Sequence, residues 1–249
     1  MSSNVREEEI VVAAADGTAD ARLFRPEGDA DHPGVLHLTD IGGIRPAHCD
    51  MGRRLAAEGY AVLMPNVFYR TRRPPMFEPG TKPGGEAWRA RFAELTKPLT
   101  AEAQESDALA YVGDLARCAG VRGGPLAVVG YCFTGGFAMR TAAVCPDRIA
   151  AAASFHGGGL WTDATTSPHL VLPRVHARLY FGHAVEDRSM PAEAIANLDA
   201  ALAAWGGRWE SEVYEGAHHG WTASNSAAYD EPQANRAFTK LTELLRAAL

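Results

Sequence analysis

A cysteine between glycines is the strongest candidate for chemistry in this chain. Residues 130–136 read Gly-Tyr-Cys-Phe-Thr-Gly-Gly, with Cys132 at the centre of the turn that they predict. An apolar stretch at 125–129 precedes this motif and a helix-like stretch at 137–144 follows it. A sharp turn between a strand and a helix exposes the side chain at its apex, and the helix N-terminus favours thiolate over thiol. The motif predicts a nucleophilic cysteine, with a buried cysteine in a glycine-rich loop, such as a phosphate loop, as the alternative.

Acid and base candidates follow two later predicted strands. The loop after one strand contains Glu186 and Asp187, and the loop after the next contains His218 and His219. A thiol that attacks an acyl group needs a base within hydrogen-bond reach, and the base needs a group that orients it. The order nucleophile, acid, histidine is that of α/β-hydrolases. These residues predict a triad of Cys132, Asp187 and one of the histidines, whereas a helix cap and loop hydrogen bonds are the structural alternatives.

Strands and helices alternate along the chain, and this alternation predicts how the candidates meet. An Asp-Gly pair at 16–17 predicts a hairpin between the first two strands. The pattern predicts an α/β fold, with a mostly parallel central sheet, an antiparallel N-terminal edge and helices on both faces. Groups that follow parallel strands lie at one edge of such a sheet. The predicted strands are 9–14, 19–25, 34–39, 60–64, 125–129, 149–154, 175–181 and 209–214, and the main helices are 46–58, 101–118, 137–144, 191–205 and 232–249.

Residues 68–100 form the least regular segment, with five prolines and three glycines. A segment of this length inside a compact domain is often a lid or a pocket loop. The alternative is a plain surface loop with a short helix near 88–95. The whole chain, 1–249, is of a length that one large α/β domain accommodates.

Composition narrows the class of protein. Hydrophobic residues make up 47% and charged residues 22% of the 249 residues, with a net charge of −6, as in ordinary globular proteins. The only basic cluster is at 70–73, so we expect no nucleic-acid partner. No signal peptide or membrane-length apolar run is present, which predicts a cytoplasmic protein without a membrane partner. The four cysteines are scattered without zinc-ligand spacing, so we expect free thiols, no metal and no organic cofactor.

With these pieces in place, the chain resembles the dienelactone hydrolase family, within the α/β-hydrolase fold. The resemblance spans roughly 9–249 and is carried by three motifs, at 130–132, 187–191 and 217–221. The family pattern places histidine directly before glycine and an aromatic residue, which implies His219 rather than His218 as the base.

The resemblance also implies a reaction and a site. The expected activity is hydrolysis of small ester or lactone substrates, as in carboxylic ester hydrolases of the EC 3.1.1 type, through an acyl-enzyme on the cysteine. The oxyanion hole would be formed by the backbone N–H groups of Ile41 and Phe133. Apart from the resemblance, we expect Asp40, Tyr131, His156 and Trp221 to contribute to the substrate pocket, with packing under a loop as the alternative for His156.

Three departures from the family pattern bear on these expectations. Asp40 stands where glutamate is usual, so its reach to the thiol is shorter by one methylene. Thr134 stands where glycine is usual, which predicts a crowded elbow. Thr222 and Ala223 occupy the stretch after Trp221 where dienelactone hydrolases proper carry an arginine for the substrate carboxylate. This last difference argues against the dienelactone itself as the substrate.

Two other functional classes remain compatible with the sequence. A thioesterase or another acyl transferase would use the same triad. A non-catalytic protein could keep the fold and use Cys132 as a covalent or redox-sensing thiol, although such a protein needs neither Asp187 nor His219 as an orienting pair. We expect a small-molecule partner and a monomer or a homodimer.

Overall fold

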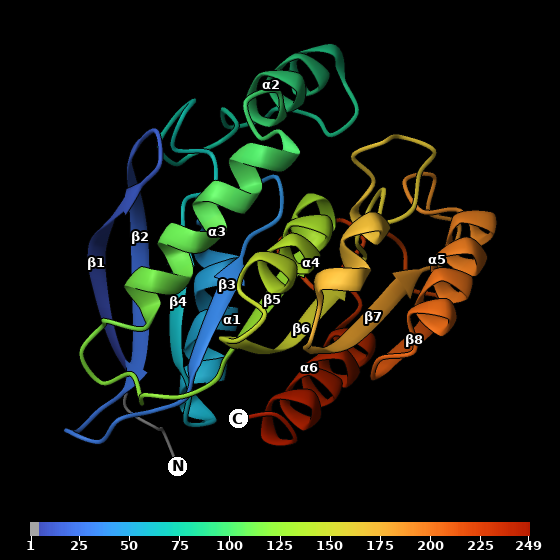
Figure 1. The fold of residues 1–249 in the computed structure, drawn as a ribbon. Coiled ribbons are helices and arrows are strands. Elements are labelled where there is room, and N and C mark those ends of the chain that lie inside the picture. The colour runs from blue at the N-terminus through green and yellow to red at the C-terminus, as the bar shows by residue number, and fades with distance from the viewer. Residues whose placement is uncertain (1–4) are drawn as a thin grey trace.

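An eight-stranded sheet forms the centre of the structure, a computed structural model that describes residues 5–249 (Figure 1). Its strand order is β1-β2-β4-β3-β5-β6-β7-β8. Strands β3 to β8 run parallel to one another, whereas β1 and β2 pair antiparallel and β2 joins β4 antiparallel. The strands are β1 (Val5–Ala14), β2 (Gly17–Pro26), β3 (Gly34–Leu38), β4 (Ala61–Pro65), β5 (Leu126–Tyr131), β6 (Ile149–Phe155), β7 (Arg178–Ala184) and β8 (Trp209–Tyr214).

Helices cover both faces of the sheet. One face packs against α1 (Pro46–Ala57) and α6 (Glu231–Arg246), and the other against α3 (Ala101–Leu115), α4 (Gly135–Val144) and α5 (Ala192–Trp205). A further helix, α2 (Glu86–Thr96), stands apart beyond one end of the sheet (Figure 1). Two short 3₁₀ helices, η1 (Cys132–Thr134) and η2 (Pro168–Arg174), complete the fold. The predicted α/β architecture with its antiparallel edge is confirmed.

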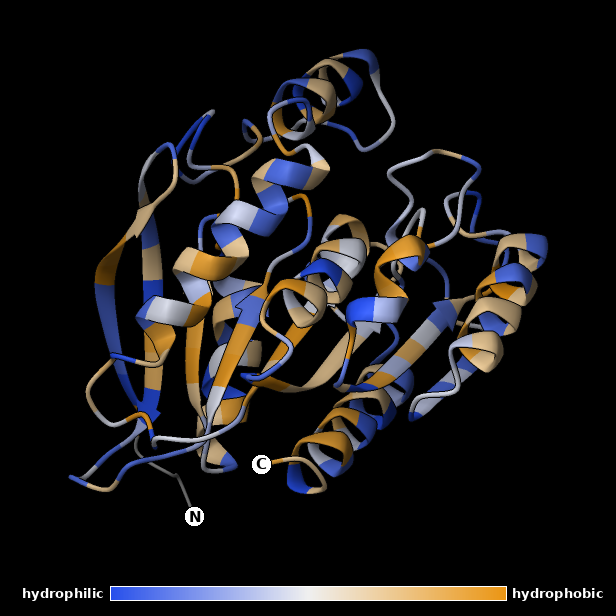
Figure 2. Ribbon diagram, viewed as in Figure 1, coloured by the Kyte–Doolittle hydropathy of each residue, from blue (hydrophilic) through white to orange (hydrophobic). Residues whose placement is uncertain are grey.

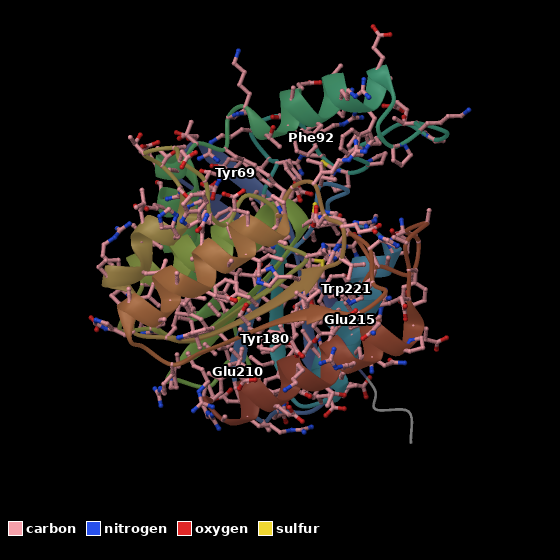
Figure 3. All side chains as sticks on the ribbon, turned by 90° about the vertical axis from the view of Figure 1, so that its right-hand side faces the viewer. Tyr69, Phe92, Tyr180, Glu210, Glu215 and Trp221 are labelled. Carbon is pink, nitrogen blue, oxygen red and sulfur yellow. The ribbon has the colours of Figure 1, made fainter. Side chains whose placement is uncertain are left out.

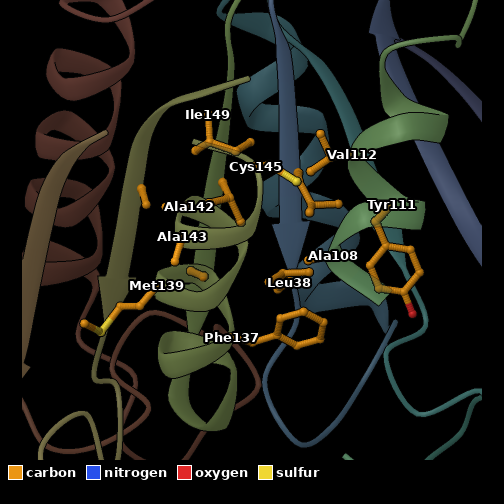
Figure 4. Close-up of a cluster of buried hydrophobic side chains, with 14 of the residues drawn as sticks. Leu38, Ala108, Tyr111, Val112, Phe137, Met139, Ala142, Ala143, Cys145 and Ile149 are labelled. Carbon is orange, nitrogen blue, oxygen red and sulfur yellow. The ribbon is translucent and has the colours of Figure 1, made fainter. Parts of the chain in front are cut away.

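The alternation of side chains along the central strands explains the two hydrophobic layers. In β5, Leu126 and Val128 face the layer under α3 and α4, whereas Val129 and Tyr131 face the layer under α1 and α6. Strands buried on both faces need apolar side chains on both, and Figure 2 shows the central strands as mostly hydrophobic. Figure 4 shows the first layer, where Phe137 from α4 lies near side chains of α3 and β3.

Several local details differ from the predictions, among them the helix predicted at 101–118, which ends at Leu115. Strand β7 continues to Ala184, beyond the predicted end at Phe181, because β8 provides pairing partners for its last residues. The polar His183 fits there because its ring bonds to Ser211 of β8. Helix η2 was not predicted, since its apolar residues are too few to show a helical period. Among residues 5–249, no helix is both long and apolar enough to cross a bilayer.

Candidate active site

The turn after β5 places Cys132 in a strained backbone conformation, with φ of 57°. The neighbouring glycines make this turn possible. A Cβ at Gly130 would lie 2.2 Å from the carbonyl oxygen of Thr134, and a Cβ at Gly135 would lie 2.3 Å from Oγ of Ser154. Any side chain at either position would therefore push the turn away from the strand end.

Thr134 fits into this elbow without the predicted crowding. Its backbone has φ of −84°, an ordinary value for any residue, and its side chain is fully buried. Its hydroxyl accepts from the Tyr131 N–H at 2.9 Å and donates to the carbonyl of Leu38 at 2.9 Å or of Tyr131 at 3.0 Å. The expectation of a crowded turn is wrong because the hydroxyl ties the elbow to β3 and β5.

Cys132, His219 and Asp187 form a hydrogen-bonded row. The sulfur lies 3.0 Å from Nε2 of His219, and Nδ1 of the same ring lies 2.6 Å from Oδ2 of Asp187. The other candidates, Glu186 and His218, are exposed and stand outside the row. The three side chains come from the ends of β5, β7 and β8, as expected for groups that follow parallel strands.

Ser189 is a member of this site that sequence reasoning missed. Its hydroxyl and its backbone N–H both donate to Oδ1 of Asp187, at 2.6 and 2.8 Å. Oδ2 is thereby left for His219. The signal in the sequence was an aspartate two residues before a serine, a spacing at which an aspartate often accepts from the backbone.

The hydrogen bonds along the row favour a charged imidazole on His219 and a charged carboxylate on Asp187. Burial disfavours a charged imidazole, yet the hydrogen bonds to Asp187 and Cys132 raise the pKa of His219 to about 10. Burial also disfavours a charged carboxylate, but the bonds from His219 and Ser189 outweigh it and lower the pKa of Asp187 to about 2. Near neutral pH the imidazole is therefore protonated beside the sulfur of Cys132.

Strain is concentrated at the ends of three neighbouring parallel strands. Cys132, His156 and Glu186 are the non-glycine residues with positive φ among those described, at 57°, 41° and 50°. Each directly follows, or lies two residues beyond, the end of β5, β6 or β7. Such conformations persist where the surrounding structure imposes them, and they are concentrated at functional sites.

These strand ends open into a cleft of about 1180 Å³ that contains the row. Two of the predicted pocket residues, Asp40 and His156, line this cleft, as do Ile41 and Phe133, the residues predicted for the oxyanion hole. Its remaining walls come from the loop at 42–46, from the segment 74–92, from Gly158 and from the loops at 187–189 and 219–226.

Tyr131 and Trp221 do not line the cleft, contrary to expectation. Tyr131 belongs to β5 and alternates to the α1 side of the sheet, where its ring lies 5.0 Å from that of His37. It lines a separate cavity of about 140 Å³. Trp221 is fully buried below the cleft, with its ring 5.0 Å from His156 and 4.9 Å from Tyr214. Both aromatics support the floor of the site.

Asp40 is occupied by an ion pair. Arg45 donates to both carboxylate oxygens, at 2.5 and 2.7 Å, and Nε2 of His48 lies 3.3 Å away. Burial alone would raise the pKa of Asp40, but His48 and Arg45 hold it well below its usual range. Among the described residues, the Asp40 carboxylate does not contact Cys132. It binds Arg45 instead.

The same carboxylate shapes the loop that holds Ile41. Its Oδ1 accepts from the Gly42 N–H at 2.8 Å, and the Asp40 carbonyl accepts from Gly43 at 3.0 Å. The Ile41 N–H, which lies between these bonded groups, has no acceptor among the described residues. A free backbone donor at the rim of the cleft can bind an oxyanion.

His156 is buried and neutral beside the row. Burial, together with the nearby His219, lowers its pKa to about 3. Its Nε2 lies 2.8 Å from the hydroxyl of Thr222, and its ring lies 5.0 Å from that of His219. Thr222 lies in the stretch where the family pattern has an arginine that this chain lacks, and its hydroxyl holds His156.

Comparisons with known proteins agree with this geometry. Residues 19–249 match the sequence model of the dienelactone hydrolase family. The chain belongs to this family. A carboxymethylenebutenolidase of Rhodococcus opacus is 28% identical over 208 residues, which cover 80% of this chain and 77% of that protein. A Synechocystis protein provisionally named a carboxymethylenebutenolidase is 26% identical over 230 residues, 91% of each chain.

A solved structure of the family shows the same fold. The crystal structure of a Klebsiella pneumoniae protein, provisionally named a dienelactone hydrolase, superposes with a TM-score of 0.85 at 23% identity and covers 97% of this chain and 98% of its own. Family and relatives together identify the protein as an enzyme, a dienelactone hydrolase-like carboxylic ester hydrolase that acts on a small molecule.

Proposed function

We propose that this family member cleaves ester or lactone bonds through an acyl-enzyme on Cys132, with His219 and Asp187 as its partners. The observation that carries the proposal is the row itself, in which the imidazole bonds to the sulfur at 3.0 Å and to the carboxylate at 2.6 Å. A nucleophile, a base and a group that orients the base are the parts that acyl transfer requires.

In the first half-reaction, the thiolate of Cys132 attacks the carbonyl carbon and forms a C–S bond. The carbonyl oxygen becomes an oxyanion between the N–H groups of Ile41 and Phe133. When the tetrahedral adduct collapses, the C–O bond breaks and the leaving alkoxide takes the proton held on Nε2 of His219. Asp187, fixed by Ser189, keeps the imidazole oriented throughout.

In the second half-reaction, water hydrolyses the thioester. The now neutral His219 removes a proton from the water, whose oxygen adds to the acyl carbon. Collapse of this second adduct breaks the C–S bond, releases the carboxylic acid and restores the thiolate beside the imidazolium. Asp187 stabilises the imidazolium each time that it forms.

The test is hydrolysis of p-nitrophenyl acetate by the wild type and by Cys132→Ala, His219→Ala and His218→Ala. The proposal requires that the first two variants lose activity, because they lack the nucleophile or the base. His218→Ala is the matched control, since this exposed neighbour stands outside the row, and it should keep the wild-type rate. Intact-protein mass spectrometry after a rapid acid quench should show one acetyl group on the wild type.

Two outcomes would overturn the proposal. An inert wild type, or a Cys132→Ala variant with the full rate, would remove the cysteine from the chemistry. A binding or redox-sensing role for the thiol would then take its place.

A further inference from the structure

Four aromatic side chains form a continuous row from the candidate nucleophile to α2. We call Phe133, Phe92, Trp88 and Phe77 the aromatic row. Ring centroids lie 6.4 Å apart between Phe133 and Phe92, 5.1 Å between Phe92 and Trp88, and 5.9 Å between Trp88 and Phe77. The last two contacts are stacked.

The aromatic row faces the cleft, although Phe77 and Phe133 also pack against the hydrophobic core. All four side chains are half-buried and line the cleft that contains Cys132. Leu95 is the one residue of α2 that is fully buried, so this helix contributes little to the core. Figure 3 labels Phe92 on the side of α2 that faces the body of the molecule. Large aromatic rings held at a cleft wall provide apolar, flat surface for a ligand.

Most charged side chains that line the cleft are paired with one another. Arg45 is held by both oxygens of Asp40, and Asp187 is held by His219. The remaining cation that lines the cleft, Arg188, is exposed to solvent. A buried carboxylate on a substrate would therefore have to displace Asp40 from Arg45. An uncharged apolar group can instead pack against the aromatic row without displacing any side-chain partner.

The volume of the cleft also exceeds what a short ester needs. Its value of about 1180 Å³ lies above the range of roughly 300–1,000 Å³ typical of small-molecule sites. We infer that the substrate is a neutral ester with a flat hydrophobic group, such as a fused aromatic ring, which lies along the aromatic row while its carbonyl meets Cys132. This inference rests on the proposed function and names its substrate class.

The experiment compares kcat/KM for ethyl acetate with that for two neutral naphthyl esters, naphthylmethyl acetate and ethyl naphthylacetate. The aromatic group is on the alcohol in one and on the acyl part in the other. The wild type should prefer at least one naphthyl ester over ethyl acetate by roughly tenfold or more, from burial and stacking of the rings. In Trp88→Ala and Phe92→Ala this preference should fall by about tenfold.

Two further variants separate a lost contact from a damaged helix. Trp88→Phe keeps an aromatic ring and should restore most of the preference. Arg89→Ala, on the exposed side of α2, is the matched control and should leave both the preference and the ethyl acetate rate unchanged. Equal kcat/KM of the wild type for the naphthyl esters and for ethyl acetate would overturn the inference. An unchanged preference for the naphthyl esters in both Trp88→Ala and Phe92→Ala would also overturn it.

An anionic ester tests the opposite charge preference. Monoethyl succinate carries a carboxylate, and ethyl butyrate is a neutral ester of similar length. A preference for monoethyl succinate of tenfold or more that disappears in Arg188→Ala would overturn the inference in favour of an anion site.

Binding to Cys132→Ala keeps this test distinct from that of the proposed function. Calorimetry with this variant should show tighter binding of a naphthyl ester than of ethyl acetate, whether or not the wild type turns either over. If wild-type turnover fails while this binding preference holds, the chemistry is refuted and the pocket assignment stands. If turnover depends on Cys132 but no binding preference exists, the pocket assignment alone is refuted.

Discussion

Replacing Thr134 by valine should destabilise the protein through its elbow, because valine has nearly the shape of threonine but no hydroxyl. The buried Tyr131 N–H would lose its acceptor, which costs about 1–3 kcal/mol for an unpaired donor. One carbonyl, of Leu38 or Tyr131, would lose a donor at a cost of roughly 0.5–1.5 kcal/mol. The free energy of unfolding should therefore fall by about 1.5–4.5 kcal/mol.

Urea denaturation followed by circular dichroism would measure this change, and thermal unfolding should show Tm lower by roughly 3–18 °C for a chain of this size. Thr134→Ser is the matched control, since it keeps the hydroxyl and loses one methyl group, at about 1 kcal/mol. A Thr134→Val variant within 0.5 kcal/mol of the wild type would refute the reasoning. The hydroxyl would then be an incidental neighbour of the turn.

Three further predictions concern charge. Asp187→Asn should lower kcat by on the order of 10²–10⁴-fold. Because Asp187 raises the pKa of His219 to about 10, its loss should also shift the alkaline limb of the kcat/KM profile to lower pH, and a limb that stays in place would contradict this role. Asp40→Ala should lower kcat by about 10–100-fold, because the loop that orients the Ile41 N–H loses its bond to the Asp40 side chain. Asp40→Asn should lower kcat less. Equal losses in kcat for the two variants would contradict this role of the side chain. Asp107→Ala should cost about 1–3 kcal/mol of unfolding free energy in urea, because Arg70 loses its bidentate partner and keeps only Asp16, while the Tyr69 hydroxyl loses its acceptor. The same variant should hasten tryptic cleavage within 68–100. Unchanged stability would remove this anchor from the segment.

The stability of the folded state should also depend on pH, through His219 and Asp187. The pKa of His219 is raised in the fold, so its contribution is present in full below about 6.5 and is lost as pH rises through about 10. The pKa of Asp187 is lowered, so its contribution is present above about 3.9 and is lost as pH falls through about 2. Both groups therefore contribute fully between roughly pH 4 and 6.5.

The sequence carried most of the architecture because periodicity and turns are local signals. Apolar runs bounded by turns located every strand of the sheet, and the Asp-Gly pair located its hairpin. The end of β7 was misplaced because strand length depends on the partner strand, and that pairing is a tertiary property. The 3₁₀ helix at 168–174 could not be predicted, because it has too few residues to show a helical period.

The proximity of Cys132, His219 and Asp187 could be predicted from the topology of the sheet, whereas the residues that line the cleft could not. Each member of the row directly follows a strand or the turn after it, so chain order and sheet order sufficed to bring the three together. Tyr131 and Trp221 are adjacent in sequence to residues that line the cleft, yet both side chains lie in the hydrophobic layer under α1 and α6. Adjacency in sequence does not decide which way a side chain points. The pairing of Asp40 with Arg45 is likewise a property of side-chain geometry that no spacing rule contained.

In the proposed function, the reacting residues and the residues that select the substrate lie in different parts of this chain. The proposed reacting groups follow the ends of β5, β7 and β8, and the backbone of Cys132 is strained. Most of the apolar wall stands on the segment 68–100, which Asp107 anchors to the body through Arg70 and Tyr69. Substitutions in that wall should change which esters are accepted while leaving the distances of the row intact. Loops on a rigid scaffold tolerate such variation, so this segment is where we expect relatives with other substrates to differ.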